Sequence, residues 1–264
     1  MVKQLIITAD DFGAAKEVND AVELAHRGGI LTAASLMVSA PAVADAVARA
    51  KTMPNLRVGL HLTLVDDRPT LPAAQIEGLV DSDGMFRSDM ARAGAAMFFL
   101  PSVRKQLAAE IEAQFKAFAA TGLTLDHVNT HKHFHLHPTI AALMMKIGAR
   151  YDMNATRVPF GTGNPLAIWL RRYYRAKGMC VADRVYGLKW SGAMTTERLG
   201  GILDALPEGL SEIYMHPATG PYPGSAAGYR YPEELAALTD VQTIEKIKSS
   251  NIVCGGFADF AHAH

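Results

Sequence analysis

The chain of 264 residues has little cysteine, no long apolar run and no excess charge of either sign. Its two cysteines, Cys180 and Cys254, lie far apart and form no CxxC pattern. We therefore expect buried free thiols in a reducing compartment instead of a disulfide framework. No apolar stretch is long enough to span a bilayer, and the apolar run before Asp10 is too short for a signal peptide. These absences predict a cytoplasmic protein.

The balance of charge also narrows the partners that we expect. Lysine and arginine together number 26, as do aspartate and glutamate, and no long basic run is present. Nucleic acid is therefore not an expected partner. Apolar residues make up 49% of the chain, which is enough for a sizeable core. The length allows one large domain or two small ones, and the order of the elements favours a single domain over residues 1–264.

Short β-rich segments alternate with segments of helical periodicity along most of the chain. Strands are predicted at 3–8, 32–39, 56–62, 156–159, 179–182, 211–215 and 251–254, and one more ends near residue 129 or 130. Helices are predicted at 18–25, 41–51, 102–120, 164–177, 195–206 and 241–249, and from Pro138 onward. An excursion at about 66–100, with a small hairpin, and a loop at 217–232 interrupt this order. The alternation predicts an α/β fold, a distorted (β/α) barrel of the TIM type built on parallel strands.

Half of the ten histidines lie in one short segment, LDHVNTHKHFHLHP at 125–138. They are His127, His131, His133, His135 and His137. Alternate residues of an extended strand share a face, so an extended segment would place all five imidazoles on one side. We expect the strand to end near Asn129 or Thr130, with the later histidines in a loop before a helix that begins at Pro138. Neutral imidazole is a common zinc ligand. One or two of the five are expected to be ligands, and the others to make hydrogen bonds.

Polar side chains recur at the end of the predicted strands. They are Asp10, Asp11, His61, His131, Arg157 and His216. The carboxyl ends of the strands of a parallel barrel meet at its catalytic face, so the fold prediction brings together residues that are far apart in sequence. We therefore expect these six side chains to form one site.

Several motifs occur in a characteristic order: TADDFG at 8–13, GLHLTL at 59–64, VNTHKHFH at 128–135, RVP at 157–159 and MHP at 215–217. In this combination the chain resembles the YdjC-like family of carbohydrate deacetylases, which includes the chito-oligosaccharide deacetylases. The resemblance extends over nearly the whole chain. Within the family, the sequence is most similar to the hopanoid-biosynthesis-associated HpnK branch.

The resemblance implies a TIM-like barrel that holds one divalent metal ion through Asp11, His61 and His131. Zinc is the expected ion, with Mg²⁺ or another divalent ion as the alternative. Asp10 would be the general base and His216 the general acid. The chain departs from the family pattern in two places. It has Asn129-Thr130-His131 where the family has Asp-Ser-His, and Thr8 where an Asn is usual.

Amide hydrolysis gives each of these residue types a task. One carboxylate and two imidazoles leave coordination positions open on a metal ion, as a catalytic site requires. The side chains of adjacent residues diverge, so Asp11 can bind the ion while Asp10 faces the water. An amine departs poorly as an anion, and His216 can supply its proton. Arg157 can pair with Asp10 and keep it ionised.

Each of these side chains also has an ordinary structural role open to it. Asp10 and Asp11 could cap the helix that follows them. His61 could be a hydrogen-bonded core histidine. Arg157 could form a surface ion pair, and His216 could be structural.

Three classes of function remain on these grounds. The first is a metal-dependent hydrolase that removes the N-acetyl group from an N-acetylglucosamine-type sugar, including a lipid-linked (hopanoid) glycoside reached by transient membrane contact. The second is a barrel metallohydrolase of another amide or of a phosphoester. The third is a histidine-rich metal-binding protein, which would not explain Asp10, Asp11 and His216. Acetate release that stops on chelation would separate the first class from the others.

Two segments are expected to form the walls of the substrate site, because both leave the catalytic face. The excursion at 66–100 ends in the apolar run Met97, Phe98, Phe99 and Leu100, and the loop at 217–232 carries Tyr222, Tyr229 and Tyr231. The tyrosines could stack on a sugar or pack within the loop. The run at 97–100 is expected to be buried core in preference to a lipid-contacting surface. The oligomeric state stays open.

Overall fold

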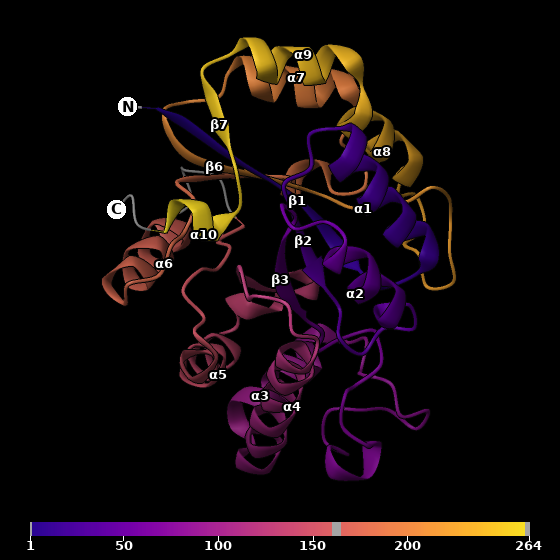
Figure 1. Ribbon diagram of the computed structural model, residues 1–264. Helices are drawn as coiled ribbons and strands as arrows, with labels where there is room; N and C mark the ends of the chain where they lie inside the picture. The colour runs from indigo at the N-terminus through magenta and orange to yellow at the C-terminus, as the bar shows by residue number, and fades with distance from the viewer. Residues whose placement is uncertain (1, 160–164, 262–264) are drawn as a thin grey trace.

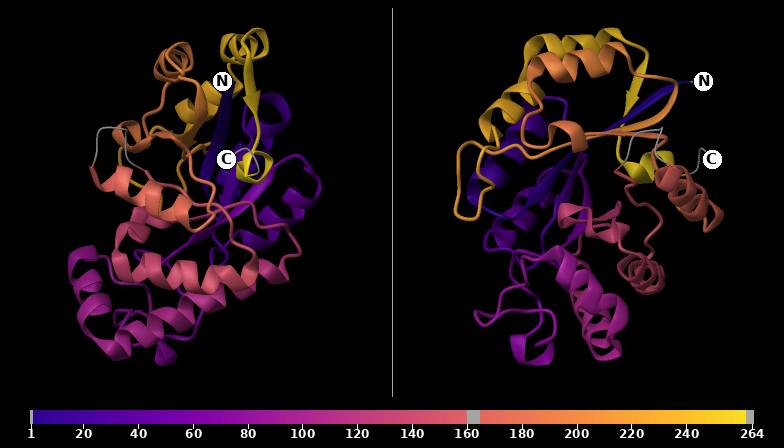
Figure 2. Two further views of the ribbon diagram at one scale, coloured as in Figure 1. Left: turned by 90° about the vertical axis from the view of Figure 1, so that its left-hand side faces the viewer. Right: turned by 180° about the vertical axis from the view of Figure 1, so that it is seen from behind.

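A computed structural model describes residues 2–159 and 165–261 (Figure 1). Within these ranges seven strands form one sheet, and every pairing in it is parallel. The strands are β1 (Lys3–Phe12), β2 (Ala33–Leu36), β3 (Arg57–Leu62), β4 (Val128–Thr130), β5 (Arg184–Tyr186), β6 (Gly209–Met215) and β7 (Ile252–Cys254). Their order is β4-β3-β2-β1-β6-β5, with β7 beside β1. The sheet curls into part of a barrel and helices surround it (Figures 1 and 2).

The helices pack around the sheet in sequence-local groups. They are α1 (Lys16–Gly28), α2 (Val43–Lys51), α3 (Met90–Phe99), α4 (Pro101–Ala120), α5 (Pro138–Gly148), α6 (Pro165–Ala176), α7 (Thr196–Asp204), α8 (Tyr231–Thr239), α9 (Val241–Ser249) and α10 (Phe257–Phe260). α3, α4 and α5 contact one another in series, and so do α7, α8 and α9 (Figure 1). None of the helices in the described ranges is both long and apolar enough to cross a membrane.

The central strand is β1, which is buried from Leu5 to Phe12. It pairs with β6 along one edge and with β7 and then β2 along the other. A strand covered on both faces and both edges favours a run of apolar side chains, and Leu5, Ile6 and Ile7 supply it. The strand continues four residues beyond the predicted end at Thr8, and so it carries both aspartates of the first motif.

The α/β fold with parallel strands is confirmed, but the ring of strands is incomplete. The predicted strands at 156–159 and 179–182 appear only as the single parallel bridges Val128↔Thr156 and Ala155↔Cys180. Pro159 lacks a donor for a longer ladder. The strand β5, which was not predicted, lies beside β6 instead. One apolar core cluster includes residues from Leu5 to Leu238, and the single domain over residues 1–264 stays a prediction.

Two expectations about side-chain burial are wrong. Cys180 is buried, but Cys254 is exposed because it lies at the end of a short strand at the sheet margin. Met97 is buried, whereas Phe98, Phe99 and Leu100 are 46%, 72% and 50% exposed. These three residues lie where α3 ends and α4 begins, and only one face of that corner meets the core.

The loop at 217–232 is shorter than expected. The helix α8 begins at Tyr231, with Pro232 in its first turn and Glu233 and Glu234 after it. Proline and acidic residues are favoured in the first turn of a helix, so the sequence carries the start signal that the loop prediction overlooked. The excursion contains α3 and an antiparallel bridge between Val80 and Phe86, which matches the small hairpin that was predicted. The predicted start of the helix at 164–177 lies outside the described residues.

Candidate metal centre and active site

The end of β1 is irregular, and this irregularity places its two aspartates. The register with β2 shifts between Ala9 and Phe12, and Asp11 has a φ of 64°. A bulge of this kind re-aims side chains at the end of a strand. The side chains of Asp10 and Asp11 therefore meet different partners. Neither caps α1, because that helix begins after Ala15 without a side-chain cap.

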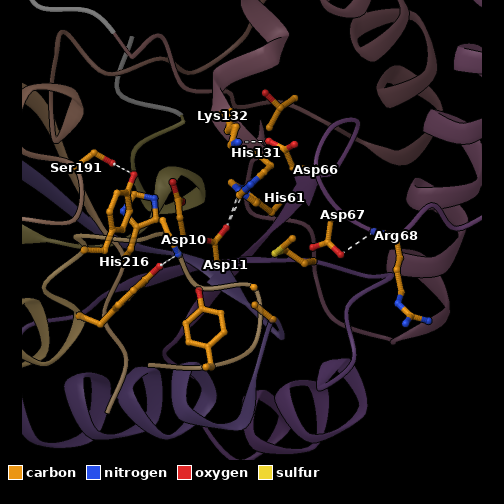
Figure 3. Close-up of a pocket in the computed structure, with 18 of the residues that line it drawn as sticks. Asp10, Asp11, His61, Asp66, Asp67, Arg68, His131, Lys132, Ser191 and His216 are labelled. Atoms are coloured by element: carbon orange, nitrogen blue, oxygen red, sulfur yellow. Dashed lines mark hydrogen bonds and ion pairs between the residues drawn. The ribbon is translucent and has the colours of Figure 1, made fainter. Parts of the chain in front are cut away.

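Asp11, His61 and His131 come together at the carboxyl ends of neighbouring strands. Asp11 Oδ1 lies 3.3 Å from His61 Nε2 and 3.1 Å from His131 Nδ1. One ligand atom from each of the three residues lies within 4.8 Å of the others, and Figure 3 shows the two rings converging on Asp11. A carboxylate with two imidazoles fits a divalent ion such as zinc and leaves positions open for water and substrate.

The charges of this cluster support one another. Burial raises the pKa of Asp11, but the attraction and hydrogen bonds of His131 and His61 prevail, and the pKa lies well below its usual value. Burial alone would lower the pKa of His131, yet Asp11 holds it above its usual value. The carboxylate is therefore ionised and ready to bind a cation.

Asn129 fixes the ring of His61 from behind. Its side-chain oxygen lies 2.6 Å from His61 Nδ1, on the opposite side of the ring from Nε2. Metal-binding histidines generally donate their other N–H to such an acceptor, which orients the ring and selects its tautomer. Asn129, which stands where the family has Asp, therefore still provides an acceptor for His61, but it carries no charge.

The histidine segment does not form the wall that an extended strand would give. β4 ends at Thr130, as predicted, and residues 131–136 form a tight turn in which Lys132 and His133 have φ values of 52° and 54°. These two left-handed residues rotate the later side chains away from a common face. Of the five histidines, only His131 joins the cluster around Asp11.

The other four histidines have separate partners. His133 Nε2 lies 2.8 Å from the Tyr214 hydroxyl. His135 is buried and bonds the Thr130 hydroxyl and the Arg157 carbonyl, each at 2.8 Å. The ring of His137 packs near Phe98 and Phe134. His127 is fully buried inside the sheet. His131 is therefore the candidate ligand among the five, and His127, His133 and His135 make hydrogen bonds.

Asp10 is held by a buried arginine. Arg157 is fully buried, and its Nη1 and Nη2 donate to the two oxygens of Asp10 at 2.5 and 3.0 Å. Its Nε and Nη2 also donate to Glu212 Oε1 at 3.0 and 2.8 Å. Burial raises the pKa of Asp10, but Arg157 outweighs it and holds the pKa below its usual value. The alternative of a surface ion pair for Arg157 is wrong.

His216 follows β6 and lines the same cavity as the metal cluster. Its backbone N–H donates to the Glu234 carboxylate, and its ring packs edge-on against Tyr229. Its Nδ1 is buried and has no hydrogen-bond partner among the described residues. In Figure 3 the two aspartates lie between His216 and the pair His61 and His131. Because His216 lines the cavity, its ring can meet a ligand there, across the aspartates from the metal cluster.

The cavity has a volume of about 710 Å³. Its walls include Tyr222, Tyr229 and Tyr231 from the predicted loop and the helix that ends it. The excursion contributes its first residues and Met85, and none of residues 97–100 lines the cavity. The predicted apolar wall is therefore wrong in its residues, because α3 carries them away from the site.

Two buried polar residues of the site were missed. Glu212 lies within β6, directly before the apolar Ile213, and a carboxylate inside a buried strand is a signal that it has a buried partner. Ser35 lies in β2 and donates to Asp10 Oδ1 at 2.9 Å. A serine in a short apolar strand carries no such signal, since its hydroxyl can equally bond its own backbone.

Comparisons with known proteins place the chain in a family. A family model described as YdjC-like protein matches residues 4–249. A protein of Geobacillus stearothermophilus named carbohydrate deacetylase is 30% identical over 98% of this chain and 99% of its own length. One of the same name from Vibrio cholerae is 27% identical over 94% and 93%. A crystal structure from Enterococcus faecalis, provisionally described as a cellobiose-phosphate cleavage protein, superposes with a TM-score of 0.82 at 24% identity, over 98% and 99% of the two chains. That likeness supports the fold.

The first prediction concerns the cluster around Asp11. Replacing Asp11, His61 or His131 by Ala removes a ligand atom, so each variant should bind a divalent ion at least tenfold more weakly than the parent chain. His137→Ala is the matched control, because that ring lies outside the cluster. Metal content after dialysis and titration calorimetry measure the effect. Full occupancy in all three variants would show that the ion binds elsewhere.

The second prediction concerns Arg157. Arg157→Met leaves two buried carboxylates without their counter-ion and should cost about 3–5 kcal/mol of unfolding free energy. Arg230→Met is the control, because Arg230 forms an exposed pair with Glu233, and such pairs contribute about 0–1 kcal/mol. Urea denaturation of the metal-free proteins measures both. Equal losses in the two variants would contradict the role given to the buried pair.

Proposed function

The chain belongs to the YdjC-like protein family, and from this premise we propose that it is a metal-dependent deacetylase that removes the N-acetyl group from an N-acetylglucosamine-type sugar. The observation that carries the proposal is the arrangement of one cavity. It holds a carboxylate with two imidazoles, a second ionised carboxylate beside them, and an imidazole opposite. The name carried by the curated relatives supports the sugar as substrate.

A divalent ion held by Asp11, His61 and His131 would lower the pKa of a water and polarise the acetyl carbonyl. Asp10 takes the proton of the attacking water. Its pairing with Arg157 keeps it ionised and also weakens it as a base, so it suits a water that is already acidified. Its Oδ2 has Arg157 as its one hydrogen-bond partner among the described residues, which leaves an acceptor position free.

His216 gives a proton to the departing nitrogen. Where the base and the acid are separate groups, the base faces the attacking water and the acid faces the departing nitrogen, so the two need different positions around the scissile bond. The position of His216, across the aspartates from His61 and His131 (Figure 3), meets that need. Tyr222 and Tyr229 offer aromatic faces to a sugar ring in the same cavity.

A pure metal-binding protein would have no use for several of these features. Burying Arg157 with two carboxylates costs desolvation energy, and leaving His216 Nδ1 buried without a partner among the described residues adds to that cost. Such costs are typical of sites that do chemistry. These features favour an enzyme over the metal-carrier alternative.

We extend the proposal to the lipid-linked class of substrate, as the similarity to the hopanoid-associated branch implies. The support is the exposed corner between α3 and α4, where Phe98, Phe99 and Leu100 form an apolar surface. Exposed apolar groups of this kind are typical of protein or membrane contact sites. A membrane-anchored glycan would gain from such a contact, whereas a free oligosaccharide would not.

The third prediction tests Asp10. Asp10→Asn keeps the shape of the side chain but cannot accept the proton, so bound metal should be retained while turnover falls by about a hundredfold or more. Acetate release from a short N-acetylglucosamine oligosaccharide measures turnover, and metal content is determined on the same sample. Near-normal turnover in this variant would place the base elsewhere. Absence of acetate release from the parent chain, with and without added divalent ions, would count against the deacetylase itself.

The fourth prediction tests the lipid-linked substrate. Replacing Phe98, Phe99 and Leu100 together by Ser should lower kcat/KM on an N-acetylglucosaminyl lipid in vesicles several-fold and leave the free oligosaccharide unaffected. Leu24→Ser is the control, because Leu24 is a comparably exposed apolar residue on α1. A parent chain that prefers the free oligosaccharide would remove the lipid-linked proposal and leave the mechanism intact.

A further inference from the structure

Beneath Asp10, three buried polar side chains form a row that the metal cluster does not require. Ser35 Oγ lies 2.9 Å from Asp10 Oδ1 and 3.0 Å from His127 Nε2. His127 Nδ1 lies 2.8 Å from Asp126 Oδ2. Ser35 and His127 are fully buried, and Asp126 is 2% exposed. The row thus leads from the reacting carboxylate into the interior of the curled sheet.

The surrounding backbone makes room for this row and supplies hydrogen-bond donors to it. Ser35 and Gly59 are register partners in β2 and β3, and a Cβ on Gly59 would lie 2.5 Å from the His127 ring. Asp126 accepts the backbone N–H groups of Phe257 and Ala258 at 3.2 and 2.9 Å, at the start of α10. Buried polar groups cost free energy unless they are paired. Each of these side chains has a partner, which indicates that the fold specifically maintains the row.

The arrangement differs from a hydrolytic Ser-His-Asp triad. A nucleophilic serine must reach its substrate, but Ser35 is fully buried and does not line the cavity. Its hydroxyl is directed at a carboxylate instead. The row therefore acts on Asp10 and not on the substrate.

Counting protons along the row gives its protonation state. A hydrogen bond between His127 Nδ1 and the Asp126 carboxylate needs a proton on Nδ1, because the carboxylate can only accept. Ser35 has one proton, and Asp10, as a carboxylate, can only accept it. The contact between Ser35 Oγ and His127 Nε2 then needs a proton on Nε2 as well.

The orientation of the Asn129 amide decides whether the Ser35 proton can go to Asp10. Its Nδ2 donates to Ser35 Oγ at 2.9 Å, while its Oδ1 faces His61 Nδ1. Rotated by half a turn, the amide would accept from Ser35 and Arg157 and donate to His61 Nδ1. The proton of a neutral His61 would then sit on Nε2 and block it as a ligand. Metal binding thus favours the first orientation, in which the only proton of Ser35 is free for Asp10.

We propose that Asp126, His127 and Ser35 form a positioning relay that holds Asp10 Oδ1 through the serine hydroxyl, with His127 carrying a proton on both ring nitrogens. Ser35, Arg157 and, at 3.4 Å, the Asn129 amide donate to Oδ1, so that Oδ2 is the oxygen turned to the reacting water. The three members are positioning residues, since none touches the substrate. The proposal rests on the proposed role of Asp10 as the base.

Ser35→Ala removes the hydroxyl at the centre of the relay. The loss of one hydrogen bond to a reacting carboxylate should lower kcat roughly tenfold, with KM and metal content unchanged. Ser35→Thr keeps the hydroxyl and should recover most of the loss. Ser211→Ala is the matched control: Ser211 is equally buried in β6, and its hydroxyl has no hydrogen-bond partner among the described residues. Acetate release from a short N-acetylglucosamine oligosaccharide gives kcat and KM.

Nitrogen-15 NMR of the histidine-labelled chain supplies a readout that does not depend on activity. At neutral pH, His127 should show two protonated ring nitrogens, assigned by the loss of these signals in His127→Gln. A neutral His127 ring would overturn the proposal, as would an unchanged kcat in Ser35→Ala or equal losses of kcat in Ser35→Ala and Ser211→Ala. A parent chain without deacetylase activity would refute the proposed function, whereas the NMR result would still decide the protonation of His127.

Discussion

The buried group formed by Arg157, Asp10 and Glu212 is the interaction on which the rest of the site depends. It ties the end of β1 to β6 and to the irregular segment that follows the single bridge at Thr156. Two carboxylates around one guanidinium are costly to bury, and apolar residues of similar size would often be as stable. The group does what apolar residues could not, because it keeps a carboxylate ionised at the edge of a cavity. The proposed deacetylase chemistry needs such a carboxylate.

Adjacent aspartates can serve two purposes here because the backbone between them is irregular. In a regular strand, Asp10 and Asp11 would point to opposite faces of the sheet. The register shift and the positive φ of Asp11 bring the second side chain to the edge where His61 and His131 end. Asp10 stays in the interior with Arg157 and Ser35. The bulge therefore gives the two neighbouring carboxylates different hydrogen-bond and ion-pair partners.

Sequence reasoning recovered the α/β order, the parallel sheet and the six polar residues at the strand ends, because each rests on local pattern and on one rule about barrels. That rule placed the six in one site, whereas the choice of Asp11, His61 and His131 as a ligand set came from the resemblance to the YdjC-like family. Glu212, Ser35 and the orientation of His127 did not follow, since each depends on a contact across strands. The exposure of Phe98 and Phe99 was missed because a short apolar run does not indicate which of its members face the core. Closure of the barrel was overestimated because a β-rich segment need not find a partner of equal length.

The central strand has its partners at both ends of the chain. Leu5 pairs with Ser211 in β6 and with Cys254 in β7, so this strand cannot complete its pairing until the chain has been made as far as these two later strands. Until then, the apolar run Leu5–Ile6–Ile7 has unsatisfied edges, and exposed strand edges of this kind promote aggregation. Non-local pairing of this kind also slows folding. A chaperone that shields the unpaired β1 segment during synthesis would therefore protect this chain from aggregation.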